Sequence, residues 1–473
     1  NYEFDKECIT NRDRMFDCPQ NLREEEMFEV PEWAANKVVY QIFPSRFAAT
    51  EPVDKELWYK APITPMDDLH GNLRGIIEHM DDIQNLGIDV LYMTPIFQSN
   101  SCHKYDTTDY YQIDPSFGTT EDLKELVQKA HERGMKVVLD AVYNHTGREF
   151  FAFADILENG EKSKYRDWYF IDGFPLKSEW GEIPNFKCFG YYGGMPKLNL
   201  KNPEVEKYIT DVACYWIKEC DIDGWRLDVG DEISHFFWKN FRKAVKAVKK
   251  DLLIIGEIWH YAGDFLEGDE WDTVMNYPFY LNLIDLLADE KITVSQFVQN
   301  LGYLKGRLNK NCYPLMWNLI DSHDTARFLH LCNDNKKKQH LAAAFQLLLP
   351  GMPMIYYGDE YAMPGANDPD CRRGMYWDEE YQDKEMYEWY KRLIQVRKSH
   401  ACIVEGELAG IVTEDEEGTI VLIRKNGEET IAMIFNCSSS AKKFNEYTQK
   451  YNLLTENTFD GNVEGFDAAV IVL

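Results

Sequence analysis

Residues 123–145 read LKELVQKAHERGMKVVLDAVYNH, and this stretch decides the fold. Its first half places apolar side chains at helical spacing, at Leu123, Leu126, Val127 and Ala130. Gly134 then ends the helix, because glycine readily adopts the conformation that stops one. Residues 137–139 follow as a short apolar run, typical of a strand buried on both faces. The stretch is one unit of helix, stop and buried strand.

The same unit recurs along the chain. Helical spacing, a stop and a short apolar run also occur within residues 73–93, 205–227 and 237–255. Alternation of this kind predicts a parallel sheet. Further apolar runs bring the expected strands to about eight, at residues 38–43, 88–93, 137–139, 224–227, 252–255, 273–275, 315–320 and 354–357. We therefore predict an α/β protein built on a (β/α)8 TIM barrel.

Two segments depart from this alternation. Residues 146–200 are rich in aromatic residues and glycine and have no clear period, which favours a long insertion over a barrel mouth. From about residue 403 the pattern changes to alternating short runs joined at Asn426-Gly427, a strong hairpin signal. These patterns predict a domain B insertion after strand 3 and a C-terminal antiparallel β-sandwich. The expected boundaries are an N-terminal extension at 1–30, the barrel (domain A) at 31–145 and 201–402, domain B at 146–200, and the sandwich (domain C) at 403–473.

The composition excludes several classes of protein. The 473 residues are 45% hydrophobic, unlike a disordered chain, and the net charge of −29 disfavours nucleic acid and anionic membranes as partners. The uncharged stretch at 341–358 contains prolines, so we interpret it as a helix, a turn and a buried strand, with no membrane span. The 11 cysteines are odd in number and lack ligand-like spacing, which leaves a complete disulfide framework impossible and a zinc site unsupported. We expect a cytoplasmic location, with export left open because a removed signal peptide leaves no trace.

Carboxylates follow four of the expected strands. They are Asp140, Asp228, Glu257 and the pair Asp321 and Asp324. Taken singly, each has a simple explanation as the N-cap of the next helix. Taken together they are harder to dismiss, because the carboxyl ends of barrel strands meet at one mouth, where active sites lie. Mutual repulsion there would raise some pKa values, which suits acid and base chemistry.

Two of these carboxylates have informative neighbours. Arg226 and Asp228 stand two apart on a strand and so face one side, where the guanidinium would keep Asp228 ionised as a nucleophile. Glu257 lies between the apolar run 252–255 and Trp259, surroundings expected to raise its pKa as a general acid requires. The alternative for Arg226 and Asp228 is a buried ion pair that only joins strands.

Five blocks together resemble the signature regions of the α-amylase superfamily, glycoside hydrolase family 13. In chain order they are DAVYNH from Asp140, MPKLN from Met195, GWRLD from Gly224, GEIWH from Gly256 and SHD from Ser322. The MPKLN block is similar to the version found in the neopullulanase, cyclomaltodextrinase and maltogenic amylase subfamily. The similarity extends from about residue 31 through the C-terminal sandwich.

The resemblance implies roles for individual residues. Asp228 would be the nucleophile, Glu257 the acid/base and Asp324 the carboxylate that grips sugar hydroxyls and stabilises the transition state. Asp140, His145, Arg226 and His323 would line the cleavage subsite, with Tyr105 stacked on its sugar ring. Trp259 matches an acceptor-side platform, and Asp368 and Arg372 match residues that contact sugar farther from the cut.

The resemblance also implies an activity. It is retaining cleavage of α-1,4-glucosidic bonds, with α-1,6 cleavage as an open addition, in malto-oligosaccharides, cyclodextrins, pullulan or starch. Water or another sugar would resolve the covalent glycosyl-enzyme, so transglycosylation is included. The alternatives are an α-glucosidase or transglycosylase on the same scaffold, and a non-catalytic amylase-like binding protein. A metal-dependent hydrolase is disfavoured, because no HxH motif follows the first strand.

A structural calcium site beside the first strand is also usual in the subfamily. Relatives bind the ion with a loop reading roughly FANGDPSND and a later Gly-Asp pair, where this chain has FAATEPVDK from Phe47 and then Gly71-Asn72. An amide has become Ala49 and a carboxylate has become Lys55, which removes two oxygen ligands and adds a repelling charge. We therefore expect that no cofactor is required and that the calcium site is degraded. The residues that still offer oxygen are Glu51, Asp54 and Asn72.

The subfamily also suggests an oligomeric state. Relatives with the MPKLN block usually carry an N-terminal β-sandwich domain that helps to form a dimer, whereas about 30 residues precede the expected barrel here. We therefore expect a monomer, or a dimer built through another surface.

Overall fold

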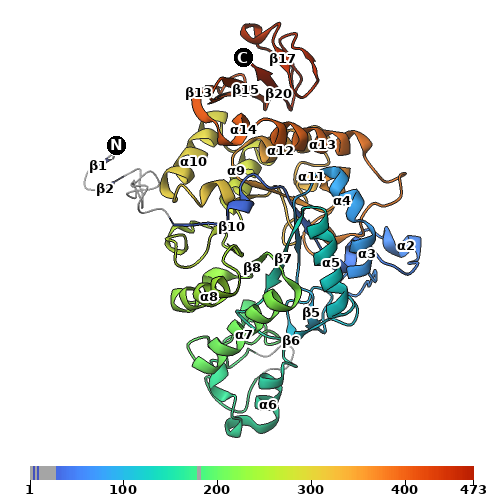
Figure 1. Ribbon diagram of the computed structural model, residues 1–473, viewed down its shortest axis with the longest axis vertical. Coiled ribbons are helices and arrows are strands. Elements are labelled where there is room, and N and C mark those ends of the chain that lie inside the picture. The colour runs from blue at the N-terminus through green and yellow to red at the C-terminus, as the bar shows by residue number, and fades with distance from the viewer. Residues whose placement is uncertain (1–3, 6–7, 10–27, 178–182) are drawn as a thin grey trace.

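The computed structural model describes residues 4–5, 8–9, 28–177 and 183–473 (Figure 1). Most of the predicted N-terminal extension lies outside these residues; within it, β1 (Phe4–Asp5) pairs antiparallel with β2 (Cys8–Ile9). Across the described residues, no helix is long and apolar enough to cross a membrane.

Eight parallel strands form the centre of the molecule. They are β3 (Val39–Ile42), β4 (Val90–Met93), β7 (Lys136–Ala141), β8 (Gly224–Leu227), β9 (Leu253–Gly256), β10 (Thr273–Val274), β11 (Trp317–Asn318) and β12 (Met352–Tyr356). Their order is β10-β9-β8-β7-β4-β3-β12-β11, and every neighbouring pair is parallel. A parallel bridge between Met275 and Trp317 joins the two outer strands. The predicted barrel is confirmed.

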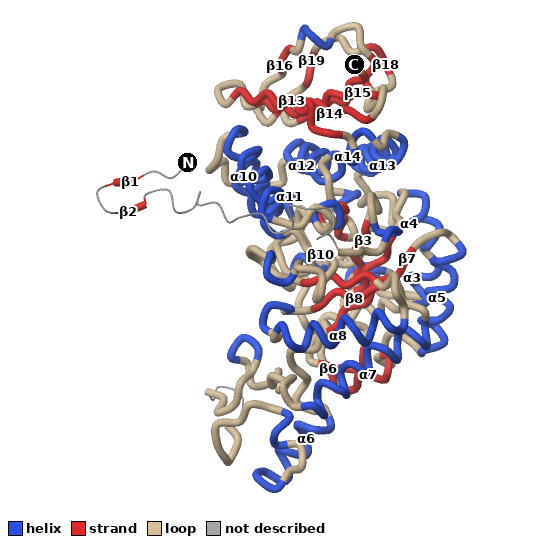
Figure 2. Tube along the Cα trace, turned by 60° about the vertical axis from the view of Figure 1, so that its left-hand side comes forward, coloured by secondary structure: helices blue, strands red, loops and turns tan. Residues whose placement is uncertain are grey.

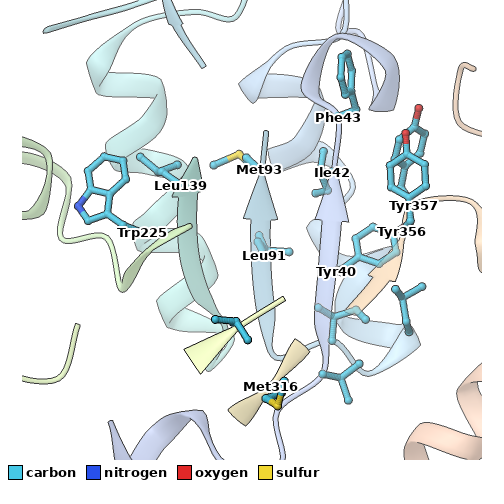
Figure 3. Packing of buried hydrophobic residues seen from close by; sticks show 14 of the residues in the cluster. Tyr40, Ile42, Phe43, Leu91, Met93, Leu139, Trp225, Met316, Tyr356 and Tyr357 are labelled. Atoms are coloured by element: carbon cyan, nitrogen blue, oxygen red, sulfur yellow. The ribbon is translucent and has the colours of Figure 1, made fainter. Parts of the chain in front are cut away.

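Alternating side chains divide each barrel strand between two buried faces. In β4, Val90 and Tyr92 belong to a cluster inside the barrel, together with Val138 and Ile255 from neighbouring strands. Leu91 and Met93 of the same strand point the other way, into the larger cluster drawn in Figure 3. Burial on both faces explains why the barrel strands are nearly continuous apolar runs.

Helices follow most of the predicted segments. They include α5 (Thr120–Glu132), α7 (Pro203–Cys220), α8 (His235–Val248) and α12 (Lys336–Leu348). A capping box between Thr119 and Asp122 starts α5, and Gly134, at a φ of 74°, turns the chain toward β7. The helical spacing that begins at Leu73 within the unit 73–93 corresponds to two helices, α3 (Leu73–Glu78) and α4 (Met80–Leu86). They meet at His79, whose ring stacks on Trp377.

The remaining helices are short or cover the second half of the barrel. They are α1 (Pro44–Phe47), α2 (Lys55–Trp58), α9 (Tyr277–Leu283), α10 (Val294–Arg307), α11 (Phe328–Leu331), α13 (Lys384–Ser399) and α14 (Cys402–Glu405). A single π-helical turn at Ile284–Ala288 extends α9.

Two excursions leave the barrel on the side where its strands end. A hairpin of β5 (Phe97–Ser99) and β6 (Thr107–Ile113) follows β4 and was not predicted. After β7 the chain forms α6 (Phe151–Asn159) and several short turns before it re-enters the barrel at α7. Isolated bridges such as His145 to Lys197 connect this insertion to itself and to the β7 loop.

The C-terminal residues form an antiparallel sheet. Its strands, in the order β13-β14-β15-β20-β17-β18, are β13 (Glu407–Glu414), β14 (Thr419–Asn426), β15 (Glu429–Asn436), β20 (Asp467–Val472), β17 (Tyr451–Asn452) and β18 (Asn457–Thr458). A two-stranded sheet of β16 (Lys442–Lys443) and β19 (Asn462–Val463) accompanies it. Asn426 pairs with Glu429 across the predicted Asn-Gly turn.

The two faces of the C-terminal sheet have different neighbours. Ile434 and its face pack against Phe444, Phe459 and Val463, within the C-terminal residues. Phe435, on the other face, stacks on Phe345 of α12 with ring centroids 4.3 Å apart. The sheet therefore lies against the barrel helices, at the opposite end of the molecule from the insertion (Figures 1 and 2).

Candidate active site

Strand alternation brings the predicted residues to one place. Val138 of β7 and Ile255 of β9 lie inside the barrel, so Asp140 and Glu257, two residues farther along, also face inward. Arg226 of β8 pairs in register with Asp140 and with Ile255. All of these residues stand at the carboxyl ends of their strands, which is the face where barrel enzymes place their active sites.

Arg226 contacts three carboxylates. Its Nη1 donates to both oxygens of Asp140, at 2.9 and 3.0 Å, and to Oδ1 of Asp228 at 2.9 Å. Its Nη2 lies 2.8 Å from Oε2 of Glu257. One buried cation therefore faces three largely buried acids, so ionising all three carries a large cost.

The buried position of these acids changes their protonation. Burial raises the pKa of Asp140 to about 6, although Arg226 and Tyr92 oppose the shift. Burial also raises the pKa of Asp228 well above its ordinary value; Arg226 lowers it, and the Glu257 and Asp140 charges raise it further. Arg226 bonds Asp228 as predicted and lowers the pKa of this carboxyl, but burial and the neighbouring acids raise that pKa. The acids share protons as a coupled group.

The two oxygens of Asp228 differ in their surroundings. Oδ1 accepts from Arg226, whereas Oδ2 is buried and has no hydrogen-bond partner among the described residues. Asp228 also lines the cavity at the barrel mouth. One carboxylate oxygen is thus oriented by the guanidinium and the other is left available to a ligand.

Glu257 is held at both of its oxygens. The backbone N–H of Val229 donates to Oε2 at 2.8 Å, and the indole N–H of Trp259 donates to Oε1 at 3.1 Å. Val229 has a φ of 46°, a left-handed conformation that a β-branched side chain rarely adopts and that costs about 1–3 kcal/mol. The strained backbone therefore directs a donor at this carboxylate. The Trp259 ring is itself fixed by stacking on Tyr277, with centroids 3.9 Å apart.

A chain of hydrogen bonds supports Asp140 from behind. Gln41 Nε2 lies 2.7 Å from His323 Nδ1, and His323 Nε2 contacts the hydroxyl of Tyr105. That hydroxyl donates to Asp140 Oδ2 at 3.0 Å. Burial lowers the pKa of His323 well below its ordinary value, so the ring is neutral. With Gln41 donating to Nδ1, the proton of His323 lies on Nε2, where it fixes the direction of the Tyr105 hydroxyl.

The insertion supplies another wall of the cavity. His145, buried and with a pKa lowered by burial to about 3, lies 3.1 Å through Nε2 from the carbonyl of Tyr105 and stacks on Phe189. Lys197 of the MPKLN block reaches Asn144 and, at 3.0 Å, Glu232. The block therefore ties the insertion to the loops that follow β7 and β8.

Asp324, the third predicted catalytic acid, also lines this cavity. Asp324 Oδ2 is 3.1 Å from His323 Nε2, and Asp324 Oδ1 is 3.4 Å from Arg372. Arg372 also pairs with Asp368 at 2.9 Å and donates to the carbonyl of His323 at 2.7 Å. The Asp324 side chain is more exposed than those of Asp228 and Glu257, and burial raises the pKa of Asp368.

These residues enclose a cavity of about 440 Å³, a size typical of small-molecule sites. The predicted residues that line it are Tyr105, His145, Asp228, Glu257, Trp259, Asp324, Asp368 and Arg372. Asp140, Arg226 and His323 lie beneath its floor, buried, and contact the lining residues from below. The structure thus brings every predicted site residue together, three of them as support.

Sequence reasoning missed several members of the site. Gln41 and Tyr92 face the barrel interior from the first two strands, and Tyr92 donates to Asp140 Oδ2 at 2.8 Å. Their inward position follows from strand alternation, but neither residue is an acid at a strand end or part of the five sequence blocks. Tyr277 and Phe189 act through ring stacking across loops, a contact with no local sequence signal.

Comparison with known proteins agrees with this geometry. The family model for the α-amylase catalytic domain matches residues 41–406. The chain belongs to the α-amylase family of glycoside hydrolases. The resemblance seen in the five sequence blocks is confirmed, and the protein is a glycosidase of this family.

Individual relatives are close over most of the chain. A cyclomaltodextrinase of Geobacillus thermopakistaniensis is 46% identical over 90% of this chain and 72% of its own length. Neopullulanase 2 of Thermoactinomyces vulgaris is 42% identical, over 88% of this chain and 72% of its own. Among solved structures, a cyclomaltodextrinase matches with a TM-score of 0.90 at 38% identity, covering 99% of this chain and 83% of the other. The cyclic α-maltosyl-(1→6)-maltose hydrolase of Arthrobacter globiformis matches with a TM-score of 0.86 at 35% identity, covering 94% and 100%.

Replacing Asp228 by Asn tests the shared protonation through stability. A carboxyl with a raised pKa takes up a proton on folding, so the stability it contributes falls as pH rises above its unfolded pKa of about 3.9. Asp228→Asn removes one acid from the three around Arg226. We expect its Tm to exceed that of the wild type by about 2 °C or more at pH 7.5, with the gain shrinking toward pH 4.5.

The measurement is calorimetric unfolding at a series of pH values. Asp251→Asn, at an exposed position, is the control and should show no such trend. A gain that grows as pH falls would contradict the raised pKa of Asp228.

Proposed function

We propose that this protein cleaves α-1,4-glucosidic bonds with retention, in malto-oligosaccharides, cyclodextrins, pullulan or starch, and that α-1,6 bonds are a second bond type to test. The observation that carries the proposal is the pair formed by Asp228 and Glu257 on one guanidinium, where Asp228 lines the cavity and its buried Oδ2 has no hydrogen-bond partner among the described residues. Relatives named cyclomaltodextrinase, neopullulanase and maltogenic α-amylase support the choice of substrates.

The reaction would proceed in two displacements. Glu257 donates its proton to the glycosidic oxygen while Asp228 Oδ2 attacks the anomeric carbon, so a covalent ester forms and the leaving sugar departs with the proton. Glu257 then takes a proton from water, and the water oxygen attacks the same carbon and releases Asp228. A retaining pair of this kind has carboxyl groups about 5 to 5.5 Å apart.

The surrounding residues would set the charges for this chemistry. Attack needs the arrangement in which Asp228 is ionised and Glu257 carries the proton. Arg226 stabilises the ionised Asp228 in that arrangement. Asp324, which is partly exposed, would bind sugar hydroxyls and offset positive charge on the sugar ring in the transition state.

Transfer to a sugar is the second fate of the same intermediate. Trp259 is 42% exposed beside Glu257, so an incoming sugar could pack on its ring and replace water as the acceptor. This position supports transglycosylation as an accompanying activity.

Two substitutions test the catalytic roles. Asp228→Asn and Glu257→Gln should each lower kcat by about 10³-fold or more, because each removes a group that acts on the reacting bond. Asp251→Asn should keep wild-type kcat. The assay is release of reducing sugar from maltotriose, β-cyclodextrin, pullulan and starch in parallel. Near-normal turnover of any of these substrates by either active-site variant would contradict the catalytic role of the residue replaced.

In the loop where relatives hold calcium, the side chains that could bind the ion make other contacts. Asp54 Oδ1 accepts the backbone N–H groups of Glu56 and Leu57, and Asn72 Oδ1 accepts that of Gly75. Lys55 pairs with Asp378 at 2.7 Å and with Glu380 at 2.5 Å. Carboxylate and amide oxygens that cap helices are poor candidates for a cation that takes six to eight oxygens, so the residues present do not fit calcium.

We therefore propose that neither folding nor catalysis needs calcium. EDTA should shift the Tm by less than about 1 °C, because there is no bound calcium for it to remove. It should leave kcat unchanged, because side chains of the protein supply the acid, the nucleophile and the stabilising carboxylate. Differential scanning calorimetry with EDTA, followed by added calcium, measures this. A drop of several degrees that calcium restores would reveal an ion site.

A further inference from the structure

A second cavity lies beside the active site. Its volume is about 430 Å³, and it is bounded by the loop that follows β9, by α9 with its π-helical turn, and by α10. Trp259 lines both this cavity and the active-site cavity. The two spaces therefore adjoin at a single indole ring.

The walls of the second cavity suit a neutral carbohydrate. Leu281 and Tyr303 expose 45% and 37% of their surfaces and line this cavity, where they offer apolar and aromatic surface to a ligand. Asn300 and Asp285 add polar groups that can bond hydroxyls. A sugar ring offers both an apolar C–H face and hydroxyls, which match these walls, and the net charge of −29 disfavours an anion.

Contacts within the protein hold these walls in place. The Arg307 guanidinium lies 3.8 Å from the centre of the Tyr261 ring and 4.9 Å from that of Tyr303. Tyr261 donates its hydroxyl proton to the carbonyl of Arg307 at 3.0 Å, and Asn300 donates to the side chain of Asn282 at 2.8 Å. A surface that is fixed before binding loses little entropy when a ligand arrives.

Trp259 also shows which side of the substrate this cavity serves. Its N–H donates to Oε1 of Glu257, the acid that protonates the leaving oxygen in the proposed function. The indole ring therefore flanks the leaving sugar, and a chain that continues past it enters the second cavity. The opposite side of the cut, toward Asp368 and Arg372, does not border this cavity.

We propose that the second cavity binds glucosyl units on the leaving-group side of the scissile bond, as an outlying subsite for long α-glucan chains. The inference rests on the proposed function and deepens it. Binding there would add affinity only for chains long enough to pass Trp259, so it would set a preference for longer substrates.

The test compares maltoheptaose with maltotriose, which is too short to fill both cavities. Tyr303→Ala should lower kcat/KM for maltoheptaose by about three- to tenfold, the value of one aromatic contact, and leave maltotriose at the wild-type value. Leu281→Trp, which fills the cavity from an exposed position, should produce the same selective loss. Tyr303→Phe keeps the ring and should keep the wild-type ratio. Tyr451→Ala, at an exposed tyrosine of the C-terminal sheet, is the matched control and should change neither value.

The outcomes separate the two proposals. If the wild type releases no reducing sugar from either substrate, the proposed function fails and this inference fails with it. If the wild type cleaves both, and Tyr303→Ala and Leu281→Trp leave the ratio unchanged or lower both values equally, only the outlying subsite is overturned. Melting curves of each variant exclude loss of folding as the cause.

Discussion

The contact on which the active site depends is that of one buried guanidinium with three carboxylates. Arg226 bonds Asp140 and Asp228 and lies 2.8 Å from Glu257. The four residues come from the carboxyl ends of three neighbouring strands, β7, β8 and β9. The barrel can bring four charged groups together because parallel strands deliver their ends to one rim. The burial of these acids raises the pKa values of Asp140 and Asp228, and a reaction that donates and then recovers a proton needs carboxyl groups in this position.

Neighbouring groups fix the orientation of the side chains around this charged centre. The backbone of Val229 and the indole of Trp259 fix the two oxygens of Glu257, and the neutral ring of His323 orients Tyr105 toward Asp140. Each of these supporting groups comes from a loop that follows a strand or from the hairpin after β4. The loops therefore orient the carboxylates that stand at the strand ends. The strained φ of Val229 is a cost that the barrel's many buried contacts can offset.

Much of the architecture could be predicted from the sequence because its signals are local. Helical spacing ending at Gly134 and the Asn426-Gly427 turn each depend on a few adjacent residues, and both predictions are confirmed. The position of Asp140, Asp228 and Glu257 at the ends of the expected strands also predicted that they lie in the site. What could not be predicted depends on contacts between distant segments: the break at His79 where Trp377 packs, the stacking of Tyr277 on Trp259, and the balance by which burial outweighs Arg226 at Asp228.

The central claim is that the unpartnered oxygen of Asp228 forms a covalent bond to the sugar. The direct measurement is intact-protein mass spectrometry and peptide mapping after reaction with an activated 5-fluoro-α-glucosyl fluoride, a substrate whose glycosyl-enzyme hydrolyses slowly. The account predicts one glycosyl group per chain, attached to Asp228, and the α-anomer as the first product of natural substrates. An adduct on another residue, or release of the β-anomer first, would contradict it.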